Sequence, residues 1–239
     1  MIALIHGEMI KVRTTRTALG FAVATLLLVL AVVLISILAG DPTDVDSKRD
    51  ALNTGGVMGV TLLLFGIVGA SGEYRHRTIA PAVLIAPDRF RLSLARLLAY
   101  MFTAIAVAVA MAALAAVLGL LLLGSTDGPD LAGSDYVRVV VGAVIAAGLS
   151  AALGVGVGIF VRNQVAGVVG ALVWILILAP LLGLIDEDIP AYTNADAAGT
   201  VGGSEGEVLS WAGGIAVLVA WAAVFVVVGL LVDRRRDVD

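Results

Sequence analysis

The sequence predicts an all-α polytopic membrane protein with six transmembrane helices. Six long apolar stretches contain no Asp, Glu, Lys, Arg or His, and each is 19 to 27 residues long. About 20 helical residues are enough to cross a hydrocarbon core. The composition, with 60% hydrophobic residues, excludes a soluble globular domain. The expected spans are 17–39, 53–71, 97–123, 139–161, 165–185 and 208–232.

The basic residues predict the orientation of these spans. Twelve of the 15 Lys and Arg precede the first span, follow the last, or lie between spans two and three or four and five. The opposite side has only Lys48, Arg49 and Arg138, with 13 of the 19 acids. Because Lys and Arg of short loops stay in the cytoplasm, we expect a multi-pass protein of the cell membrane (cell inner membrane or plasma membrane) with both termini in the cytosol. An even number of spans also places the termini on one side.

Residues 1–16 have a helical period of their own. The apolar residues that share one face are Ile2, Ile5, Met9 and Val12. Glu8, Lys11 and Thr15 share another face. This pattern predicts a short amphipathic helix in the cytoplasmic interface, with its apolar face in the acyl boundary and its cations near anionic headgroups. The alternative is an ordinary positively charged flank that only sets the orientation.

The cytoplasmic segment 72–96, between the second and third spans, carries most of the inner charge and also an apolar run, 79–86. A simple connection between two spans has no need of such a run. A short amphipathic helix that docks into the groove of a cytosolic partner would use it. The alternative is a basic surface loop held to anionic lipid.

The extracytoplasmic segments are acidic. Segment 40–52 holds four aspartates, and segment 186–207 holds six acids and no base, with a proline and several glycines that argue against one long helix. Asp186, Glu187 and Asp188 could hold a divalent cation, since hard cations prefer carboxylate oxygens. Such a triplet is more often the acidic outer flank of a span, so we expect no metal site.

Several kinds of chemistry are missing from the sequence. The only histidines, His6 and His76, lie in cytoplasmic segments, and the chain has no cysteine. A Ser–His, Cys–His or His-ligated metal site therefore cannot form within the bilayer, and no GxxxxGK[ST] phosphate-binding loop occurs. Spans without ionisable residues also argue against a proton- or sodium-coupled pump. We expect neither an enzyme nor a self-powered transporter, which leaves an externally driven transport subunit, a passive channel or a membrane anchor.

The spans offer few polar groups to a cargo. Those expected along a path for an apolar or amphipathic substrate are Thr61, Tyr100, Thr103 and Ser150. Nothing in the spans indicates the charged or carbonyl-lined constriction of an ion channel. The glycines of spans two and four should permit close helix packing near such a path: Gly59, Gly66, Gly148 and Gly156.

The residues after the second span resemble a pattern in the permease subunits of type-2 ATP-binding-cassette (ABC) exporters. That pattern has a glutamate, an aromatic residue, an arginine and a threonine, then an apolar stretch, then Pro-x-Arg before the third span. Here it reads Glu73-Tyr74-Arg75-His76-Arg77-Thr78, and then Pro87-Asp88-Arg89. The similarity extends over residues 1–239 as one transmembrane permease domain, and the small drug- and antibiotic-efflux members are the most similar in composition.

The resemblance implies that two permeases associate and that each docks on a separate cytosolic ATPase subunit, which binds the ATP and Mg. It places a coupling helix within 73–86, seated in a cleft of the ATPase, and a smaller contact at the inner turn 162–164. The residues implied in coupling are Glu73, Tyr74, Arg75, Arg77, Thr78, Pro87, Arg89, Arg162, Asn163 and Gln164. Pro81 departs from the pattern, so the coupling helix starts or is broken there.

The expected function is that of a permease subunit of an ATP-driven ABC exporter. Its substrate would be apolar or amphipathic: a drug, an antibiotic or a lipid-like compound. The alternative is a membrane scaffold or signalling subunit that docks on the same ATPase and moves no cargo. The chain itself is expected to bind no cofactor and no nucleic acid. Its expected partners are the ATPase subunits, a second permease copy or paralogue, and the bilayer.

Overall fold

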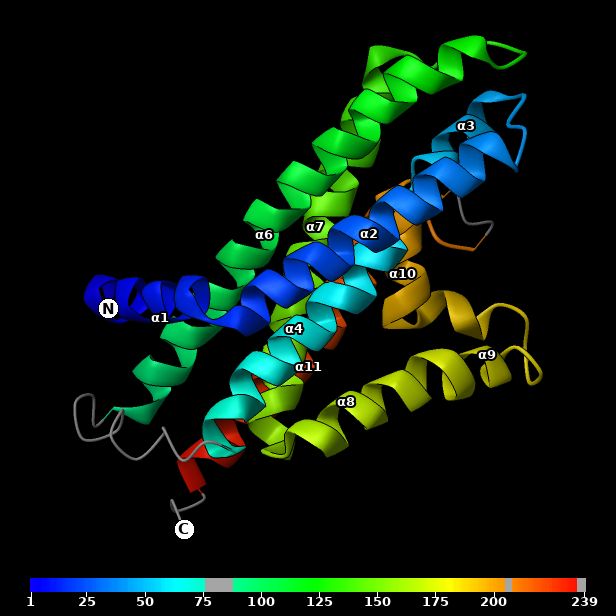
Figure 1. Ribbon diagram of the computed structural model, residues 1–239. Helices are drawn as coiled ribbons and strands as arrows, with labels where there is room; N and C mark the ends of the chain where they lie inside the picture. The colour runs from blue at the N-terminus through cyan, green and yellow to red at the C-terminus, as the bar shows by residue number, and fades with distance from the viewer. Residues whose placement is uncertain (76–87, 205–207, 236–239) are drawn as a thin grey trace.

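The described part of the computed structural model, residues 1–75, 88–204 and 208–235, contains six helices long and apolar enough to cross a membrane, and no strand (Figure 1). The predicted all-α polytopic membrane fold is therefore confirmed. The continuous crossings are α2 (Arg16–Leu38), α4 (Gly55–Arg75), α6 (Arg89–Leu122), α7 (Gly133–Val161) and α11 (Trp211–Arg235). The fifth crossing combines α8 (Gln164–Val173), a π-helical turn (Trp174–Leu178) and α9 (Ala179–Leu182).

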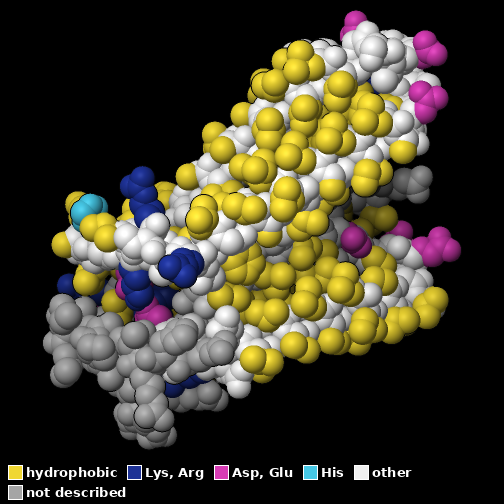
Figure 2. Space-filling view, viewed as in Figure 1, with side chains coloured by type: hydrophobic (Ala, Val, Ile, Leu, Met, Phe, Trp, Pro, Cys, Tyr) yellow, Lys and Arg dark blue, Asp and Glu magenta, His cyan; other side chains and the backbone are white. Residues whose placement is uncertain are grey.

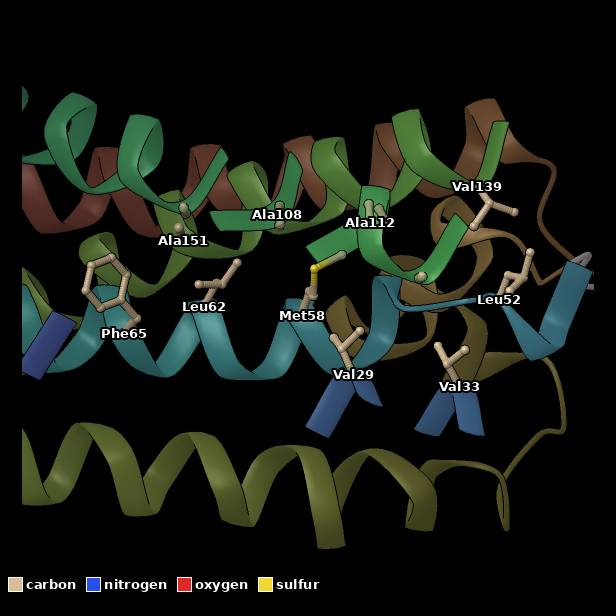
Figure 3. Close-up of a cluster of buried hydrophobic side chains, with 14 of the residues drawn as sticks. Val29, Val33, Leu52, Met58, Leu62, Phe65, Ala108, Ala112, Val139 and Ala151 are labelled. Carbon is tan, nitrogen blue, oxygen red and sulfur yellow. The ribbon is translucent and has the colours of Figure 1, made fainter. Parts of the chain in front are cut away.

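Two helices form the centre of the bundle and four surround them. In α4 and α7, 67% of the most apolar window is buried, against 11% to 22% in the other four crossings. Figure 3 shows larger side chains of α4, such as Met58 and Leu62, facing the small Ala108 and Ala112 of α6. Alternating large and small side chains let these helices interdigitate at high packing density.

Glycines bring α4 and α7 into backbone contact. A Cβ atom at Gly66 would overlap the carbonyl oxygen of Ala151, and one at Gly154 would overlap that of Leu63. Of the other glycines predicted to permit close packing, Gly156 lies against the backbone of α11, whereas Gly59 and Gly148 lie against side chains of α10 and α6. Small residues therefore set the distance between the central helices, as is usual in membranes.

Three helices extend beyond the spans that hydropathy predicts. α6 begins at Arg89 instead of Leu97, α7 begins at Gly133 instead of Val139, and α4 continues to Arg75. The Asp88 carboxylate caps α6 by accepting a hydrogen bond from the backbone N–H of Arg91. Charged residues such as Arg favour helices as much as Leu does, so the charges end the hydrocarbon crossing without ending the helix.

Short helices complete the two ends. The first outer segment, expected only as a polar loop, contains α3 (Val45–Ala51). The Asp44 carboxylate accepts hydrogen bonds from the backbone N–H groups of Ser47 and Asp46 at the start of α3. The hydrogen bonds from Ser47, above all, lower the pKa of the Asp44 carboxyl below its usual value. A 3₁₀ turn (Leu123–Ser125) follows α6.

The segment before the last crossing folds back into the bundle. It forms a 3₁₀ turn (Ile189–Tyr192) and α10 (Asn194–Gly202), so it is not one long helix, as its glycines predict. The apolar side of α10 is buried against α4, α7 and α11: Ala197, Ala198 and Val201 are at most 1% exposed. Within the described residues, Asp186, Glu187 and Asp188 form no group of three that could hold a metal ion.

The N-terminal segment forms the helix α1 (Ile2–Thr14), which lies across the end of α6 (Figure 1). Val12 of the predicted apolar face and Glu8 of the polar face are both buried, whereas Ile2 is 85% exposed. Glu8 and Lys11 find charged partners at this end of the bundle.

Candidate functional site

Charge separates the two ends of the molecule. In Figure 2, blue Lys and Arg side chains gather around α1, and most of the visible magenta Asp and Glu side chains lie at the opposite end, with apolar surface between them. This arrangement follows the division of basic residues in the sequence. The basic end, which the positive-inside rule assigns to the cytoplasm, holds most of the predicted coupling residues.

Four charged side chains from three helices meet at this end. We call Glu8, Lys11, Glu73 and Arg96 the inner ion cluster. The Arg96 guanidinium of α6 and the Lys11 ammonium of α1 both pair with the Glu73 carboxylate of α4. Lys11 Nζ also lies 3.4 Å from Glu8 Oε1, and Arg96 Nε lies 3.9 Å from Glu8 Oε2.

Three members of the inner ion cluster are buried, Lys11 is partly exposed, and the charges balance. Arg96 is 1% exposed and Glu73 is 5% exposed, and the cluster contains two carboxylates and two cations. Burying a charge is costly unless it is paired and hydrogen-bonded. Burial also lowers the pKa of the Lys11 ammonium, although the adjacent Glu8 carboxylate opposes this shift. The cluster therefore holds α1, α4 and α6 together only while every member keeps its partners.

A second polar network lies beside the first and is centred on Asp233 near the end of α11. We call Tyr74, Ser93, Arg162 and Asp233 the Asp233 network. The Asp233 carboxylate, 4% exposed, accepts hydrogen bonds from the hydroxyls of Tyr74 and Ser93 and from Arg162 Nη2, each at 2.9 Å. The Arg162 guanidinium also lies 5.0 Å from the centre of the Tyr74 ring, a cation–π distance.

Local backbone geometry places Arg162 in this network. Arg162 follows the last residue of α7 with φ of 55°, in the left-handed region that commonly ends helices. The next residue, Asn163, caps α8: its side-chain oxygen accepts a hydrogen bond from the backbone N–H of Ala166. The inner turn 162–164 is thus a tight connection between two membrane crossings that also contributes a cation to Asp233.

Glu73 and Tyr74 join the two networks because they are consecutive residues in the last turn of α4. Through the inner ion cluster, the end of α4 is connected to α1 and α6. Through the Asp233 network, it is connected to α6, α11 and the end of α7. The predicted coupling segment, 73–86, begins with this turn. Any displacement of the end of α4 must therefore move, or break away from, four other helices.

The structure brings together three of the predicted coupling residues, Glu73, Tyr74 and Arg162. Because Glu73 is buried, its carboxylate binds within the chain instead of facing a partner. Asn163 has a capping role, and Gln164 is half-buried at the start of α8. The other predicted coupling residues fall outside the described part of the chain, either as whole residues (Arg77, Thr78 and Pro87) or in their side chains (Arg75 and Arg89).

A pocket of about 290 Å³ adjoins the inner ion cluster, and we call it the inner pocket. Lys11, Glu73 and Gln164 line its polar part, and Phe65 and Tyr100 line its apolar part. The Phe65 and Tyr100 ring centres lie 5.0 Å apart. The Tyr100 ring also fills the space that a Cβ atom at position 69 would need, so this packing requires Gly69. The inner pocket is amphipathic.

The four residues predicted along a substrate path have different surroundings. Tyr100 lines the inner pocket. Thr61 and Thr103 donate their hydroxyls to carbonyl groups of their own helices. Ser150 is 1% exposed, and its hydroxyl has no hydrogen-bond partner among the described residues. The substrate path itself stays a prediction.

Sequence reasoning missed Arg96, Ser93 and Asp233 as members of these networks. Arg96 directly precedes the third predicted span, and Asp233 directly follows the sixth. One signal was available in both cases: each lies within one helical turn of an uncharged span. A charge so close to the hydrocarbon is expected to be paired if it is buried.

No protein-family model matches the chain, and no curated protein sequence matches it. The function proposed below is accordingly supported by the sequence pattern and by the geometry of the basic end.

Proposed function

We propose that this polytopic membrane protein is the permease subunit of an ATP-driven ABC exporter. The observation that carries the proposal is the anchored end of α4. Its last turn holds Glu73 and Tyr74, which belong to the inner ion cluster and the Asp233 network. This turn begins segment 73–86, within which the resemblance places the coupling helix. A partner that moves this segment would act on a site already connected to most of the bundle.

The proposed mechanism is mechanical. Closure of the ATPase subunits around ATP and Mg displaces the coupling segment, and the displacement reaches the last turn of α4. Paired charges transmit it to α1 and α6, and the Asp233 carboxylate transmits it to α11 and to the Arg162 turn between α7 and α8. Interfaces and packed cores have discrete arrangements and do not deform continuously, so the bundle changes shape as a unit.

The proposed cargo is apolar or amphipathic. The six spans contain no charged residue in their predicted hydrocarbon portions, so they cannot favourably hydrate a strongly polar solute. The inner pocket combines charged and aromatic lining, which suits a compound with a polar head and an apolar body. A drug, an antibiotic or a lipid-like compound has this character.

The test begins with the native complex. The chain is purified from its host with the ATPase that accompanies it, and the complex is placed in lipid nanodiscs. ATP hydrolysis is then measured against matched panels of amphipathic and small polar compounds. We expect stimulation by amphipathic compounds. Stimulation by polar or ionic compounds alone would contradict the cargo class, and absence of any ABC-type ATPase would contradict the whole proposal.

The alternative of a membrane scaffold or signalling subunit has a different outcome in the same assay. Such a subunit would copurify with the ATPase, yet no compound of either panel would stimulate hydrolysis or move across the membrane. The variant Glu73→Ala sharpens the comparison. In an exporter it should reduce substrate-stimulated hydrolysis more than basal hydrolysis, because the coupling segment loses its anchor. The control Arg91→Ala changes an exposed ion pair at the same end, with Asp88, and should alter neither rate.

A further inference from the structure

The fifth crossing lies away from the rest of the bundle and leaves a cavity behind it. Only 11% of its most apolar window is buried, the lowest value of the six crossings in the described chain. Figure 1 shows α8 and α9 diverging from the other helices. The cavity has a volume of about 360 Å³ and is bordered by α4, α7, α8, the π-helical turn and α11. We call it the lateral cavity.

Small residues and a helix irregularity keep the lateral cavity open. Gly167 and Gly170 of α8 both line it, and a Cβ atom at Gly170 would meet nothing within 4 Å. The π-helical turn begins at Trp174, which also lines the cavity. Single π-helical turns within α-helices frequently occur at functional sites. Here the turn sets the position of a large aromatic side chain at the cavity wall.

Aromatic side chains form one wall of the lateral cavity, and their polar atoms are already paired. Trp174 Nε1 donates a hydrogen bond to Asn194 Oδ1, and Trp221 Nε1 donates one to the backbone carbonyl of Tyr192, both at 3.0 Å. The Trp174 and Trp221 rings are 5.5 Å apart, and Phe225 stacks on Trp221. The tryptophan N–H groups are thus used within the protein, so the surface that these rings present to the cavity is apolar.

The remaining lining is aliphatic or aromatic, with Leu63, Leu153 and Phe160 among its members. Asn194, the one polar side chain of the lining, is engaged by Trp174. A polar ligand would therefore lose its hydration without gaining hydrogen bonds. An apolar ligand would gain dispersion contacts that an empty cavity lacks.

We propose that the lateral cavity binds an acyl chain of a bilayer lipid, which enters sideways between the fifth and sixth crossings. The cavity borders helices that cross the membrane, so the surrounding solvent is hydrocarbon and an acyl chain is the available apolar ligand. Its volume falls within the range of roughly 300–1,000 Å³ typical of small-molecule sites. The proposal depends on the membrane-crossing helices and not on the ATPase, so it can fail or succeed independently of the exporter function.

Tryptophan fluorescence gives a direct test. The chain has three tryptophans, and Trp211→Phe leaves Trp174 and Trp221, which both line the lateral cavity. This protein is placed in vesicles of phosphatidylcholine brominated at mid-chain, because bromine quenches a tryptophan that it contacts. We expect strong quenching, and we expect Gly170→Phe in the same background to lose most of it by filling the cavity with a ring.

A matched control separates the lateral cavity from ordinary lipid contact. Gly20 of α2 is also exposed, and a Cβ atom there also meets nothing within 4 Å, but Gly20 does not line the cavity. Gly20→Phe should leave the quenching unchanged. Ala171→Leu, a smaller change in the cavity lining, should reduce quenching in part, and it serves if Gly170→Phe fails to fold.

A second measurement identifies the ligand. Native mass spectrometry after detergent washing should show a retained phospholipid in the parent protein and in Gly20→Phe, but not in Gly170→Phe. Equal quenching and equal lipid retention in the two phenylalanine variants would overturn the proposal. The proposal would also be overturned if the parent protein were a dimer, showed weak quenching and retained no lipid. A second copy of the chain would then cover the cavity.

Discussion

Arg96 and Glu73 form a pair whose energy depends on both partners being present. Arg96 is 1% exposed and Glu73 is 5% exposed. Desolvating both charges costs so much that a buried pair often adds little net stability. Removing one partner is different, because the other charge then stays buried without compensation. The inner ion cluster is for this reason a sensitive point of the structure, whether or not it contributes to net stability.

Glu73→Ala should lower the free energy of unfolding by about 3–5 kcal/mol, the usual cost of breaking a buried ion pair. Glu73→Leu combined with Arg96→Met should be less harmful than Glu73→Ala, since it removes both charges and keeps apolar volume. Thermal unfolding in detergent, followed by circular dichroism, ranks the variants. Arg91→Ala is the control, because its pair with Asp88 is exposed and worth about 0–1 kcal/mol. A Glu73→Ala protein as stable as Arg91→Ala would contradict the role given to the cluster.

At the level of single residues, the sequence pointed to side chains of the polar networks but did not predict their partners. The motif after the second span selected Glu73 and Tyr74, the resemblance implied Arg162 as a smaller contact, and Tyr74 and Arg162 share Asp233 as a partner. Their partners Arg96 and Asp233 are distant in the sequence. Only the packing of helix ends brings these groups together. A short sequence motif cannot predict that packing.

The contact between α4 and α7 depends on glycine at the scale of whole helices. A Cβ atom at Gly66 would overlap the backbone of α7, and two backbones cannot yield without moving the helices apart. We expect Gly66→Ala to lower the melting temperature and to weaken assembly of the native complex. Gly20→Ala should be neutral or should stabilise by up to roughly 1 kcal/mol, since alanine is the better helix former and the site is open. Equal melting temperatures would contradict the backbone contact.

The length of helix α6 leads to a second prediction at the scale of whole helices. Its 34 residues, at about 1.5 Å each, far exceed a hydrocarbon thickness of about 30 Å. The third predicted span, 97–123, already has 27 residues, and the helix continues beyond it to Arg89. We expect a spin label at Arg91→Cys to be accessible to a water-soluble relaxation agent. A label at Phe102→Cys, on an exposed apolar position, should be accessible to oxygen instead. Burial of both labels in lipid would contradict an extended helix.

Hydropathy located every membrane crossing but not the irregular elements between them. The uncharged runs predicted α2 and the other crossings to within a few residues at most ends, because the cost of a charge in hydrocarbon is large. α3 and α10 were not predicted. α3 depends on local capping by Asp44, and α10 is stabilised by burial against three distant helices. The π-helical turn at 174–178 has no signature in the hydrophobic pattern.

The distribution of charge over the whole molecule predicts its orientation in the membrane. Figure 2 shows basic and acidic side chains at opposite ends, and 12 of 15 Lys and Arg belong to the segments assigned to the cytosol. The chain lacks cysteine, so single cysteines can report position. Arg13→Cys should react with an impermeant maleimide only after the cells are broken open. Asp130→Cys should react in intact cells. The reverse pattern would contradict the topology.

The filled centre of one copy predicts that transport needs two. α4 and α7 occupy the middle of the bundle and touch backbone to backbone at Gly66 and Gly154. Thr61 and Thr103, two of the predicted path residues, donate their hydroxyls within their own helices. We therefore expect the proposed cargo to move along the outside of this bundle, where a second permease, identical or paralogous, would enclose it. Native mass spectrometry of the active complex should show two permeases with two ATPase subunits. Cargo-stimulated hydrolysis by a complex with one permease would contradict a path at the interface.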